Sequence, residues 1–402
     1  MIDAPHGLAA VLRGPAKPDL AIDPRVVVVS DTVDHTDGIA IGLGRLAVAA
    51  RRAGHAMTLV GSAAGARAVA VDDAVVRIPA AMSAALPIYP DYVWHVPELP
   101  PLVAQLAAHA DLVQLATPGP MGLAGLIAGR MLGLPVIGQY HTEVAEYAAR
   151  MTGLPFVAGL VSPFVGWFYR QVDLCLAPSA AVEARLASLG VDEHRICRVP
   201  RGCDLQLFDP ARRARASLGW GDEPVVLYVG RLSREKNLDV LAAAWRIVRA
   251  RHPNARLVVA GDGPARATLA ACAGATLYGT LHGEALAQVF ASADVFAFPS
   301  ETETFGNVVV EAAASGVPAV VVRAGAAHEH VIAGETGEIV ASNDAPAFAA
   351  AIGALLDDPA RRAAMAHAAR VHAASYDLDR AVAATWAIYR DVEAPSRARA
   401  AS

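Results

Sequence analysis

Closely spaced cysteines and long apolar runs are both scarce in this sequence. Its four cysteines show no C-x-x-C spacing and lie beside no paired histidine motif, so neither a disulfide framework nor a zinc site is indicated. The first twenty residues lack the basic start and apolar run of a signal peptide, which predicts a cytoplasmic protein. The uncharged stretch 151–169 is long enough to span a bilayer, but Pro155, Pro163 and three glycines interrupt it. We expect two short apolar helices there, and membrane contact that is peripheral at most, at the inner face.

A large excess of charge is also missing. The formal net charge is -5, and charged residues make up 18% of the 402 residues. Since no basic patch stands out, the sequence gives no indication of nucleic-acid binding. The hydrophobic content of 54% is inflated by alanine, which is typical of helices packed on sheets. The length predicts two globular domains of ordinary size.

Short apolar runs alternate with helical stretches in two successive series. The alternation predicts an α/β fold with two doubly wound parallel sheets. In the first series we expect strands at 26–29, 57–60, 74–78, 111–115, 135–139 and 174–177. In the second series we expect them at 225–229, 257–260, 294–298 and 319–322. A proline-rich connection without regular structure is expected over 86–101.

The boundary between the two series lies in a segment rich in proline and glycine. Residues 199–224 show no clear periodicity, so the interdomain linker is expected there. The first predicted domain comprises residues 1–205, completed by a C-terminal helix at 376–392, and the second comprises residues 206–375. The carboxyl ends of parallel strands are where ligands bind, so two such sheets facing each other would place a two-part substrate in a cleft between them.

The most informative segment follows the apolar strand that ends at Phe298. It reads S-E-T-E-T-F-G-N-V-V-V-E-A-A-A-S-G-V-P, with two carboxylates, Glu303 and Glu311, eight positions apart. A helix N-terminus binds phosphate through free amides, while nearby carboxylates suit sugar and ribose hydroxyls. Two isolated glutamates would more simply be a capping acid and a solvated helix residue. The residues that would offer backbone groups at this helix start are Thr304, Phe305, Gly306 and Asn307.

Other polar residues follow strands in the same way. Arg231 and Lys236 follow the strand at 225–229 in the sequence G-R-L-S-R-E-K-N. In the first series, Asp37-Gly38-Ile39 comes before a helix, and Tyr140-His141-Thr142 comes directly after the strand at 135–139. Any one of these groups alone would be a solvated loop or a structural histidine. Their repeated position at strand ends favours a shared site.

Together these motifs resemble those of retaining glycosyltransferases with the GT-B fold, and more narrowly those of family 4. The segment 303–311 is similar to the family's E-x7-E motif, and 230–237 is similar to its G-R-L-x-x-x-K-N loop. The resemblance extends from about residue 27 to residue 389 and is stronger in the second half. It implies two Rossmann-like domains facing across a cleft, with a C-terminal helix that returns to the first domain.

The resemblance also implies a role for each motif. Arg231 and Lys236 would clamp the donor diphosphate, Glu303 would hold the donor sugar and Glu311 the ribose. From the first domain, Gly38 would approach the donor phosphate and His141 would face the reacting sugar. The turns after two further strands would contribute Gly263 and, near the base, Leu281. The loop 325–329 resembles a degenerate G-G-x-x-E loop, so the pair His328 and His330 is not interpreted as a metal site.

The function implied is transfer of a hexose from a nucleotide diphosphate sugar to an acceptor hydroxyl, with retention and without a metal or a cofactor. No D-x-D metal motif is evident. Other GT-B chemistry, such as that of a nucleotide-sugar epimerase or a phosphorylase, stays open, as does a sugar-nucleotide-binding module without activity. A dinucleotide-dependent oxidoreductase is disfavoured because no G-x-G-x-x-G follows the strand at 26–29. Whether the donor carries uridine or guanosine, and whether the acceptor is a lipid or a small molecule, is left open.

Overall fold

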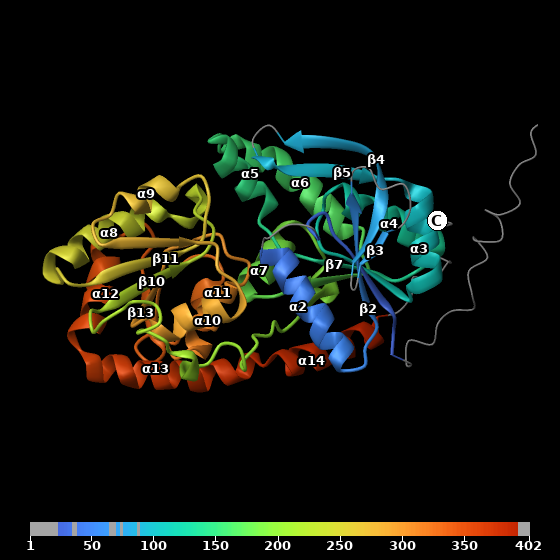
Figure 1. The fold of residues 1–402 in the computed structure, drawn as a ribbon. Coiled ribbons are helices and arrows are strands. Elements are labelled where there is room, and N and C mark those ends of the chain that lie inside the picture. The colour runs from blue at the N-terminus through green and yellow to red at the C-terminus, as the bar shows by residue number, and fades with distance from the viewer. Residues whose placement is uncertain (1–22, 34–37, 64–69, 73–74, 87–88, 393–402) are drawn as a thin grey trace, which may run out of the picture. The chain divides into compact units, whose positions relative to one another are not determined.

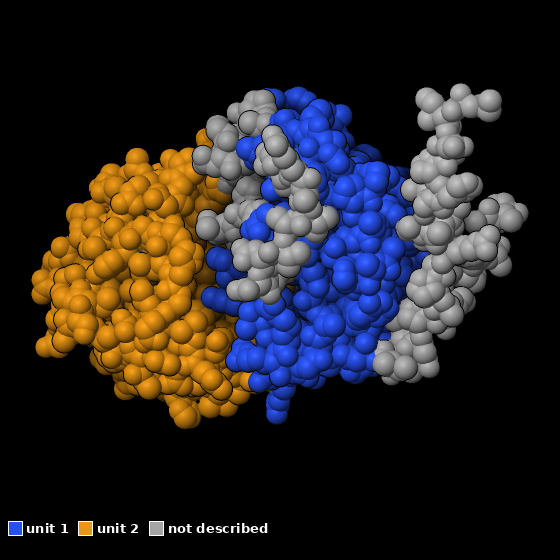
Figure 2. Space-filling model, turned by 45° about the vertical axis from the view of Figure 1, so that its right-hand side comes forward, with its two compact units in different colours: residues 1–178, 182–200, 379–402 blue, residues 179–181, 201–378 orange. Residues whose placement is uncertain are grey.

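The chain folds into two compact units, each with its own sheet. The computed structural model describes residues 23–33, 38–63, 70–72, 75–86 and 89–392 (Figure 1). Unit 1 comprises residues 1–178, 182–200 and 379–402, and unit 2 comprises residues 179–181 and 201–378 (Figure 2). Both sheets consist mainly of parallel strands with intervening helices, which confirms the predicted α/β fold class.

In the described residues of unit 1, nine strands form one sheet. They lie in the order β3-β4-β2-β1-β6-β7-β8-β9, with β5 paired to β4. β3 and β5 pair with β4 in antiparallel fashion, and the other pairs are parallel. The strands are β1 (Val26–Val29), β2 (Met57–Ala63), β3 (Ala70–Asp72), β4 (Val75–Leu86), β5 (Tyr89–Pro97), β6 (Leu112–Leu115), β7 (Val136–Gln139), β8 (Leu174–Ala177) and β9 (Ile196–Arg198).

Helices separate most of these strands and bury their side chains. β1, β6 and β7 are buried at every position, as expected for central parallel strands with both faces covered. The helices of this part of the chain are α2 (Gly38–Arg52), α3 (Leu99–His109), α4 (Pro120–Leu132), α5 (Val144–Thr152), α6 (Phe156–Arg170) and α7 (Ala180–Ser188), with a 3-10 turn at Glu193–Arg195.

Two predictions for unit 1 are wrong. Residues 86–101 are not an irregular connection, because most of them form β5, which pairs with the long strand β4. Proline was read there as a strand breaker, but a strand with only one partner tolerates residues that cannot donate a ladder hydrogen bond. The stretch 151–169 holds one helix, α6, rather than two, and Pro163 lies inside it. None of the helices in the described residues is both long enough and apolar enough to cross a membrane.

Unit 2 is built on a six-stranded, wholly parallel sheet, counted over its described residues. The order is β12-β11-β10-β13-β14-β15. Val225–Val229 at its centre is buried throughout, and the strand was predicted with these bounds. The strands are β10 (Val225–Val229), β11 (Arg256–Ala260), β12 (Ala275–Gly279), β13 (Val295–Phe298), β14 (Ala319–Val322) and β15 (Gly337–Val340).

Two groups of helices pack on this sheet. α8 packs on α9 and α12, whereas α11 packs on α10 and α13. Right-handed crossovers on either side of the reversal place these groups on opposite faces. The helices are α8 (Leu238–Arg251), α9 (Arg266–Ala270), α10 (Gly283–Ser292), α11 (Asn307–Ala314), α12 (Ala345–Asp357) and α13 (Pro359–Ala373), with 3-10 turns at Pro210–Arg212, Arg234–Lys236, Ala327–His330 and Ala374–Tyr376.

The predicted linker at 199–224 belongs almost entirely to unit 2. Phe208 and Trp220 are buried in its core, so this irregular segment is packed rather than a spacer. The chain leaves unit 2 near the start of α14 (Leu378–Asp391), and the rest of α14 belongs to unit 1. There Trp386 stacks on His55 with ring centroids 4.5 Å apart, and both Trp386 and Tyr389 are fully buried. The predicted return of the terminal helix is thereby confirmed.

Candidate functional site

The strand order of unit 2 reverses between β10 and β13, which are neighbours in the sheet. In an open parallel sheet, ligands bind beyond the carboxyl ends of the strands at such a reversal. Arg231 and Lys236 lie in the loop after β10, and Glu303 lies in the loop after β13. The topology therefore brings the two most informative motifs to one end of the sheet.

Lys236 and Glu303 are in direct contact, although 67 positions separate them in the sequence. The Lys236 ammonium forms an ion pair with the Glu303 carboxylate, and their side chains are only 19% and 16% exposed. The Ser300 hydroxyl donates to the same carboxylate oxygen over 2.7 Å. Burial raises the pKa of Glu303, but the neighbouring ammonium and hydroxyl outweigh burial and lower it below its ordinary value. The site thus holds an ionised carboxylate beside a cation.

The loop that carries Arg231 is fixed through its backbone. The Tyr228 hydroxyl donates to the Arg231 carbonyl over 3.0 Å, and the Leu232 amide donates to the Asp262 carbonyl over 2.9 Å. The next turn approaches so closely that a Cβ atom on Gly261 would lie 1.9 Å from the carbonyl oxygen of the residue before Arg231. The loops after β10 and β11 are therefore packed backbone to backbone, and only glycine fits between them.

The turns that carry Gly263 and Leu281 lie at the same end of the strands. Gly263 follows β11, and a Cβ atom there would lie 2.5 Å from the Leu232 carbonyl oxygen. Leu281 follows β12, precedes α10 and packs against the core. The structure thus places both predicted residues beyond the carboxyl ends of β11 and β12, the two strands on one side of β10.

The E-x7-E segment forms a loop followed by α11. Gly306 caps this helix with a φ of 94°, a conformation that favours glycine, and Asn307 is its first residue. Thr304 and Phe305 before the cap are buried, as is Glu311 in the second turn. The Val309 amide donates to the Gly306 carbonyl over 2.9 Å. The amides before it lie at the positive end of the helix dipole, so this end can accept an anion.

A further loop, at 325–327, packs against the backbone of the E-x7-E loop. The Ala326 amide donates to the Glu303 carbonyl over 2.8 Å. Gly325 has a φ of 57°, and a Cβ atom on it would lie 2.6 Å from the Glu301 carbonyl oxygen. The sequence indicated this loop only through its resemblance to a degenerate family motif. The contact itself was missed, because no spacing rule joins segments more than twenty residues apart.

The predicted residues of the first half lie in unit 1, around the carboxyl ends of its strands. His141 is buried two residues after β7. Beside it, the Tyr140 hydroxyl donates to Glu143 over 2.9 Å, and Arg185 on α7 donates to the same carboxylate over 3.2 Å. Burial, together with the Glu143 charge, raises the pKa of Tyr140. This side of unit 1 therefore holds a connected polar group next to the predicted histidine.

The loop after β1 is fixed by a carboxylate that the sequence did not single out. Asp31 accepts hydrogen bonds from the Thr117 hydroxyl over 2.5 Å and from the Met121 amide over 2.9 Å, at the start of α4. Gly38 is the first residue of α2 and is exposed. Asp37, the residue before it in the predicted D-G-I motif, lies outside the described residues.

The histidine pair at 328 and 330 lies on the 3-10 turn Ala327–His330. His330 is buried, whereas His328 is only partly buried. Among the described residues, no group of three or more histidine, cysteine or carboxylate side chains is placed to hold a metal ion.

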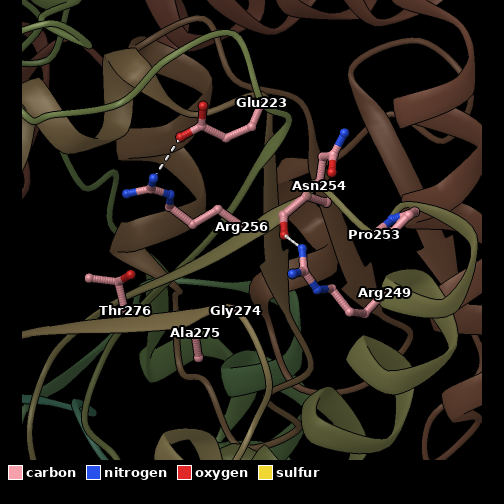
Figure 3. A pocket seen from close by; sticks show the side chains of 9 residues that line it. Glu223, Arg249, Pro253, Asn254, Arg256, Gly274, Ala275 and Thr276 are labelled. Atoms are coloured by element: carbon pink, nitrogen blue, oxygen red, sulfur yellow. Dashed lines mark hydrogen bonds and ion pairs between the residues drawn. The ribbon is translucent and has the colours of Figure 1, made fainter.

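A shallow hollow of about 520 Å³ lies elsewhere in unit 2 (Figure 3). Its lining includes Arg256 and Ala275, which begin β11 and β12, so it opens at the amino ends of the strands. Its two arginines already have partners: Arg249 donates to the Ala255 carbonyl, and Arg256 pairs with Glu223 over 2.8 Å. The hollow therefore lies at the amino ends of the strands, whereas Lys236 and Glu303 lie beyond the carboxyl ends.

Comparison with known proteins identifies related sequences over most of the chain. The profile described as Glycosyltransferase Family 4 matches residues 36–207, and the profile described as Glycosyl transferases group 1 matches residues 211–372. The Sulfoquinovosyl transferase SQD2 of Arabidopsis thaliana is 34% identical over 294 residues, which cover 69% of this chain and 56% of that protein. The chain spans between half and three fifths of the length of several curated relatives that it matches.

Two further proteins are similar over a larger share of their own length. The GDP-mannose-dependent alpha-(1-6)-phosphatidylinositol monomannoside mannosyltransferase of Mycolicibacterium smegmatis is 32% identical over 278 residues, which cover 65% of this chain and 71% of that protein. The solved structure of sucrose-phosphate synthase from Thermosynechococcus elongatus superposes with a TM-score of 0.71 at 25% identity, and covers 96% of this chain and 98% of that one.

Proposed function

The chain belongs to glycosyltransferase family 4 and has the GT-B fold, and on this premise we propose that it is a retaining hexosyltransferase. Its donor is a nucleotide diphosphate sugar, and it uses neither a metal nor a cofactor. The observation that carries the proposal is the contact between Lys236 and Glu303 where the strand order of unit 2 reverses. A cation for phosphate and a carboxylate for hydroxyl groups stand together where a phosphorylated sugar needs both.

The two basic residues of the first loop serve the leaving group. When the bond between the anomeric carbon and the phosphate oxygen breaks, its electron pair stays on that oxygen as negative charge. Arg231 and Lys236 stabilise this charge in place of a metal ion, which is the kind of preorganised electrostatic stabilisation that dominates many enzymatic rate enhancements. The acceptor hydroxyl oxygen then bonds to the anomeric carbon on the same face, and its proton passes to the departing phosphate.

The other predicted residues bind and orient the donor. Glu303 accepts hydrogen bonds from the sugar hydroxyls, and Glu311 accepts them from the ribose. The amides that open α11 bind the diphosphate. In this proposal residues 206–375 are the donor domain, while residues 1–205 with the helix 376–392 are the acceptor domain and contribute His141 to the sugar. The remaining donor-binding residues are Gly38, Gly263, Leu281, Thr304, Phe305, Gly306 and Asn307.

A panel of GDP-, UDP- and ADP-sugars tests the proposal, and one relative named above is GDP-mannose-dependent. We expect a GDP- or UDP-hexose to stabilise the protein by about 2.7 kcal/mol at 100 times its dissociation constant, and ADP-glucose to have no effect. Thermal unfolding with each nucleotide sugar in excess EDTA measures this. Turnover with the stabilising donor should be equal with and without EDTA. Absence of stabilisation by every GDP- and UDP-sugar would refute the assignment, and a requirement for Mg²⁺ or Mn²⁺ would refute the metal-free mechanism.

An exposed apolar stripe on α6 favours a lipid acceptor. Phe156, Leu160, Phe164 and Trp167 are 64%, 69%, 40% and 43% exposed, and their spacing of four, four and three places them on one helix face. The opposite face, with Phe168 and its neighbours, is buried in the core of unit 1. The side chains of the stripe therefore do not contribute to the core of unit 1. Exposed aromatic and leucine side chains on a helix can insert into the interfacial region of a bilayer. We assign it to peripheral contact with the membrane that carries the acceptor.

Vesicle flotation tests this assignment. We expect the wild-type chain to float with vesicles of phosphatidylcholine and phosphatidylinositol, and the variant Phe156→Ser with Leu160→Ser to remain at the bottom. Both positions are on the surface, so stability should change by only about 0.5 kcal/mol for each. Ile247→Ser is the control, because Ile247 is 42% exposed on α8 of unit 2 and outside the stripe. A wild-type chain that never floats would instead indicate a small, soluble acceptor.

A further inference from the structure

His330 is a buried histidine of unit 2 that has no place in the site described above, yet it contacts the E-x7-E loop. Its Nε2 atom lies 2.7 Å from the Phe305 carbonyl oxygen, and its Nδ1 atom lies 2.9 Å from the Tyr376 hydroxyl. The Phe305 ring packs against the imidazole with centroids 4.2 Å apart, and the Tyr376 ring meets it edge to face at 5.2 Å. Both ring nitrogens are therefore occupied.

The partners determine which nitrogen carries the proton. A carbonyl oxygen can only accept, so Nε2 is the donor to Phe305. Burial lowers the pKa of His330 to about 4, so the ring is neutral near pH 7 and Nδ1 is an acceptor. The Tyr376 hydroxyl must then donate to Nδ1. The result is a directed chain of two hydrogen bonds from Tyr376 through His330 to Phe305.

This chain determines the orientation of one peptide group in the loop. The Phe305 carbonyl and the Gly306 amide belong to the same planar, trans peptide unit, so their C=O and N-H bonds point in opposite directions. When His330 holds the carbonyl toward the core, the Gly306 amide points away from the core at the start of α11. Gly306 has a φ of 94°, so this peptide could otherwise rotate toward other conformations that glycine permits.

Tyr376 is itself held in place at the edge of unit 2. Its carbonyl accepts a hydrogen bond from the Cys203 amide over 2.7 Å, and Cys203 forms an isolated β-bridge with Asp377. These contacts join the segments by which the chain enters and leaves unit 2. From the same segment, the Arg201 guanidinium lies 5.8 Å from the centre of the Phe305 ring. The loop, the buried histidine and the partly buried tyrosine thus pack against one another.

We infer that His330 and Tyr376 are positioning residues for the donor, which orient the Phe305–Gly306 peptide so that its amide faces the diphosphate. The inference rests on the proposed function, because it assumes that a nucleoside diphosphate binds at the start of α11. Neither side chain touches the donor. Both act through the backbone of the E-x7-E loop.

Titration calorimetry with GDP and UDP, without any acceptor, tests this inference. We expect His330→Leu to weaken binding of the preferred nucleotide roughly tenfold, because the peptide loses its restraint. His330→Gln retains an N-H donor close to the position of Nε2, and its affinity should stay within about threefold of wild type. Tyr376→Phe, which loses only the second hydrogen bond, should fall between the two. The control is His367→Ala, at an exposed position on α13.

The thermal midpoints of the same variants separate positioning from simple destabilisation. Positioning is supported if His330→Gln binds the nucleotide nearly as tightly as the wild type does, while its thermal midpoint is no higher than that of His330→Leu. Equal affinity in wild type, His330→Leu and Tyr376→Phe would overturn the inference, while binding by the wild type would leave the proposed function intact. If the wild type binds neither nucleotide, the proposed function itself fails. If His330→Leu does not fold, the other three proteins decide the question. Affinity that falls from wild type to His330→Gln to Tyr376→Phe supports the inference, and any other order overturns the inference.

Discussion

Replacing Lys236 by alanine is expected to lower turnover at least ~100-fold, and Arg231→Ala is expected to do the same. In the proposed mechanism, both substitutions remove positive charge that stabilises the leaving phosphate as it gains negative charge in the transition state. The loss should appear mainly in kcat, with a smaller change in the affinity for the donor. Steady-state kinetics with the donor that stabilises the protein measures both quantities.

Lys236 also contributes to stability, which affects the test of its role in turnover. Lys236 also neutralises the buried Glu303 carboxylate, so its removal leaves an uncompensated charge that costs stability. The double variant Lys236→Met with Glu303→Gln removes both charges, and we expect it to recover stability without recovering turnover. Arg234→Ala is the matched control, since Arg234 is exposed in the same loop. Near-normal turnover in both Lys236→Ala and Arg231→Ala would contradict the diphosphate clamp.

The strands that could be predicted from the sequence are those at the centres of the sheets. Val26–Val29 and Val225–Val229 are unbroken runs of apolar residues, and each is buried at every position. Helices cover both faces of a central parallel strand, so its pattern does not depend on any particular neighbour. Both strands were predicted with the bounds that the structure shows.

The failures concern segments whose structure depends on tertiary packing. Pro163 was read as a helix break, yet α6 continues through it, because Val165 and Phe168 beyond the proline bury their side chains in the core. The same holds for the predicted linker, where Phe208 is buried although no periodicity surrounds it. Local propensity is a weak prior where burial of a few large side chains outweighs it.

In the site, too, the residues in local sequence motifs could be predicted, whereas contacts that depend on tertiary packing could not. Lys236 and Glu303 were recognisable because each belongs to a motif with fixed spacing next to a strand. The bracing contacts of His330 and Ala326 were not, because they depend on how the loop after β14 packs against the loop after β13. The sequence therefore indicated the residues proposed to touch the donor, and only the fold showed those that hold them in place.

The close packing of the loops after β10 and β11 leads to the second large effect. We expect Gly261→Ala to destabilise the protein by roughly 3 kcal/mol or more, since overpacking against rigid backbone adds to the strain of a glycine conformation. The added Cβ atom would lie 1.9 Å from the Gly230 carbonyl oxygen, and the φ of Gly261 is 148°. To relieve the clash, the peptide before Arg231 must move, so turnover should also fall.

Gly279→Ala separates the clash from the backbone conformation. Gly279 has a φ of 73° at the end of β12, and a Cβ atom there would meet nothing within 4 Å. Its substitution should cost only about 1 kcal/mol, which is the strain of the left-handed conformation alone. Denaturant unfolding of both variants, with donor turnover measured on the folded protein, gives the comparison. Equal losses in the two variants would show that the loops after β10 and β11 yield to each other and that their packing does not hold Arg231 in place.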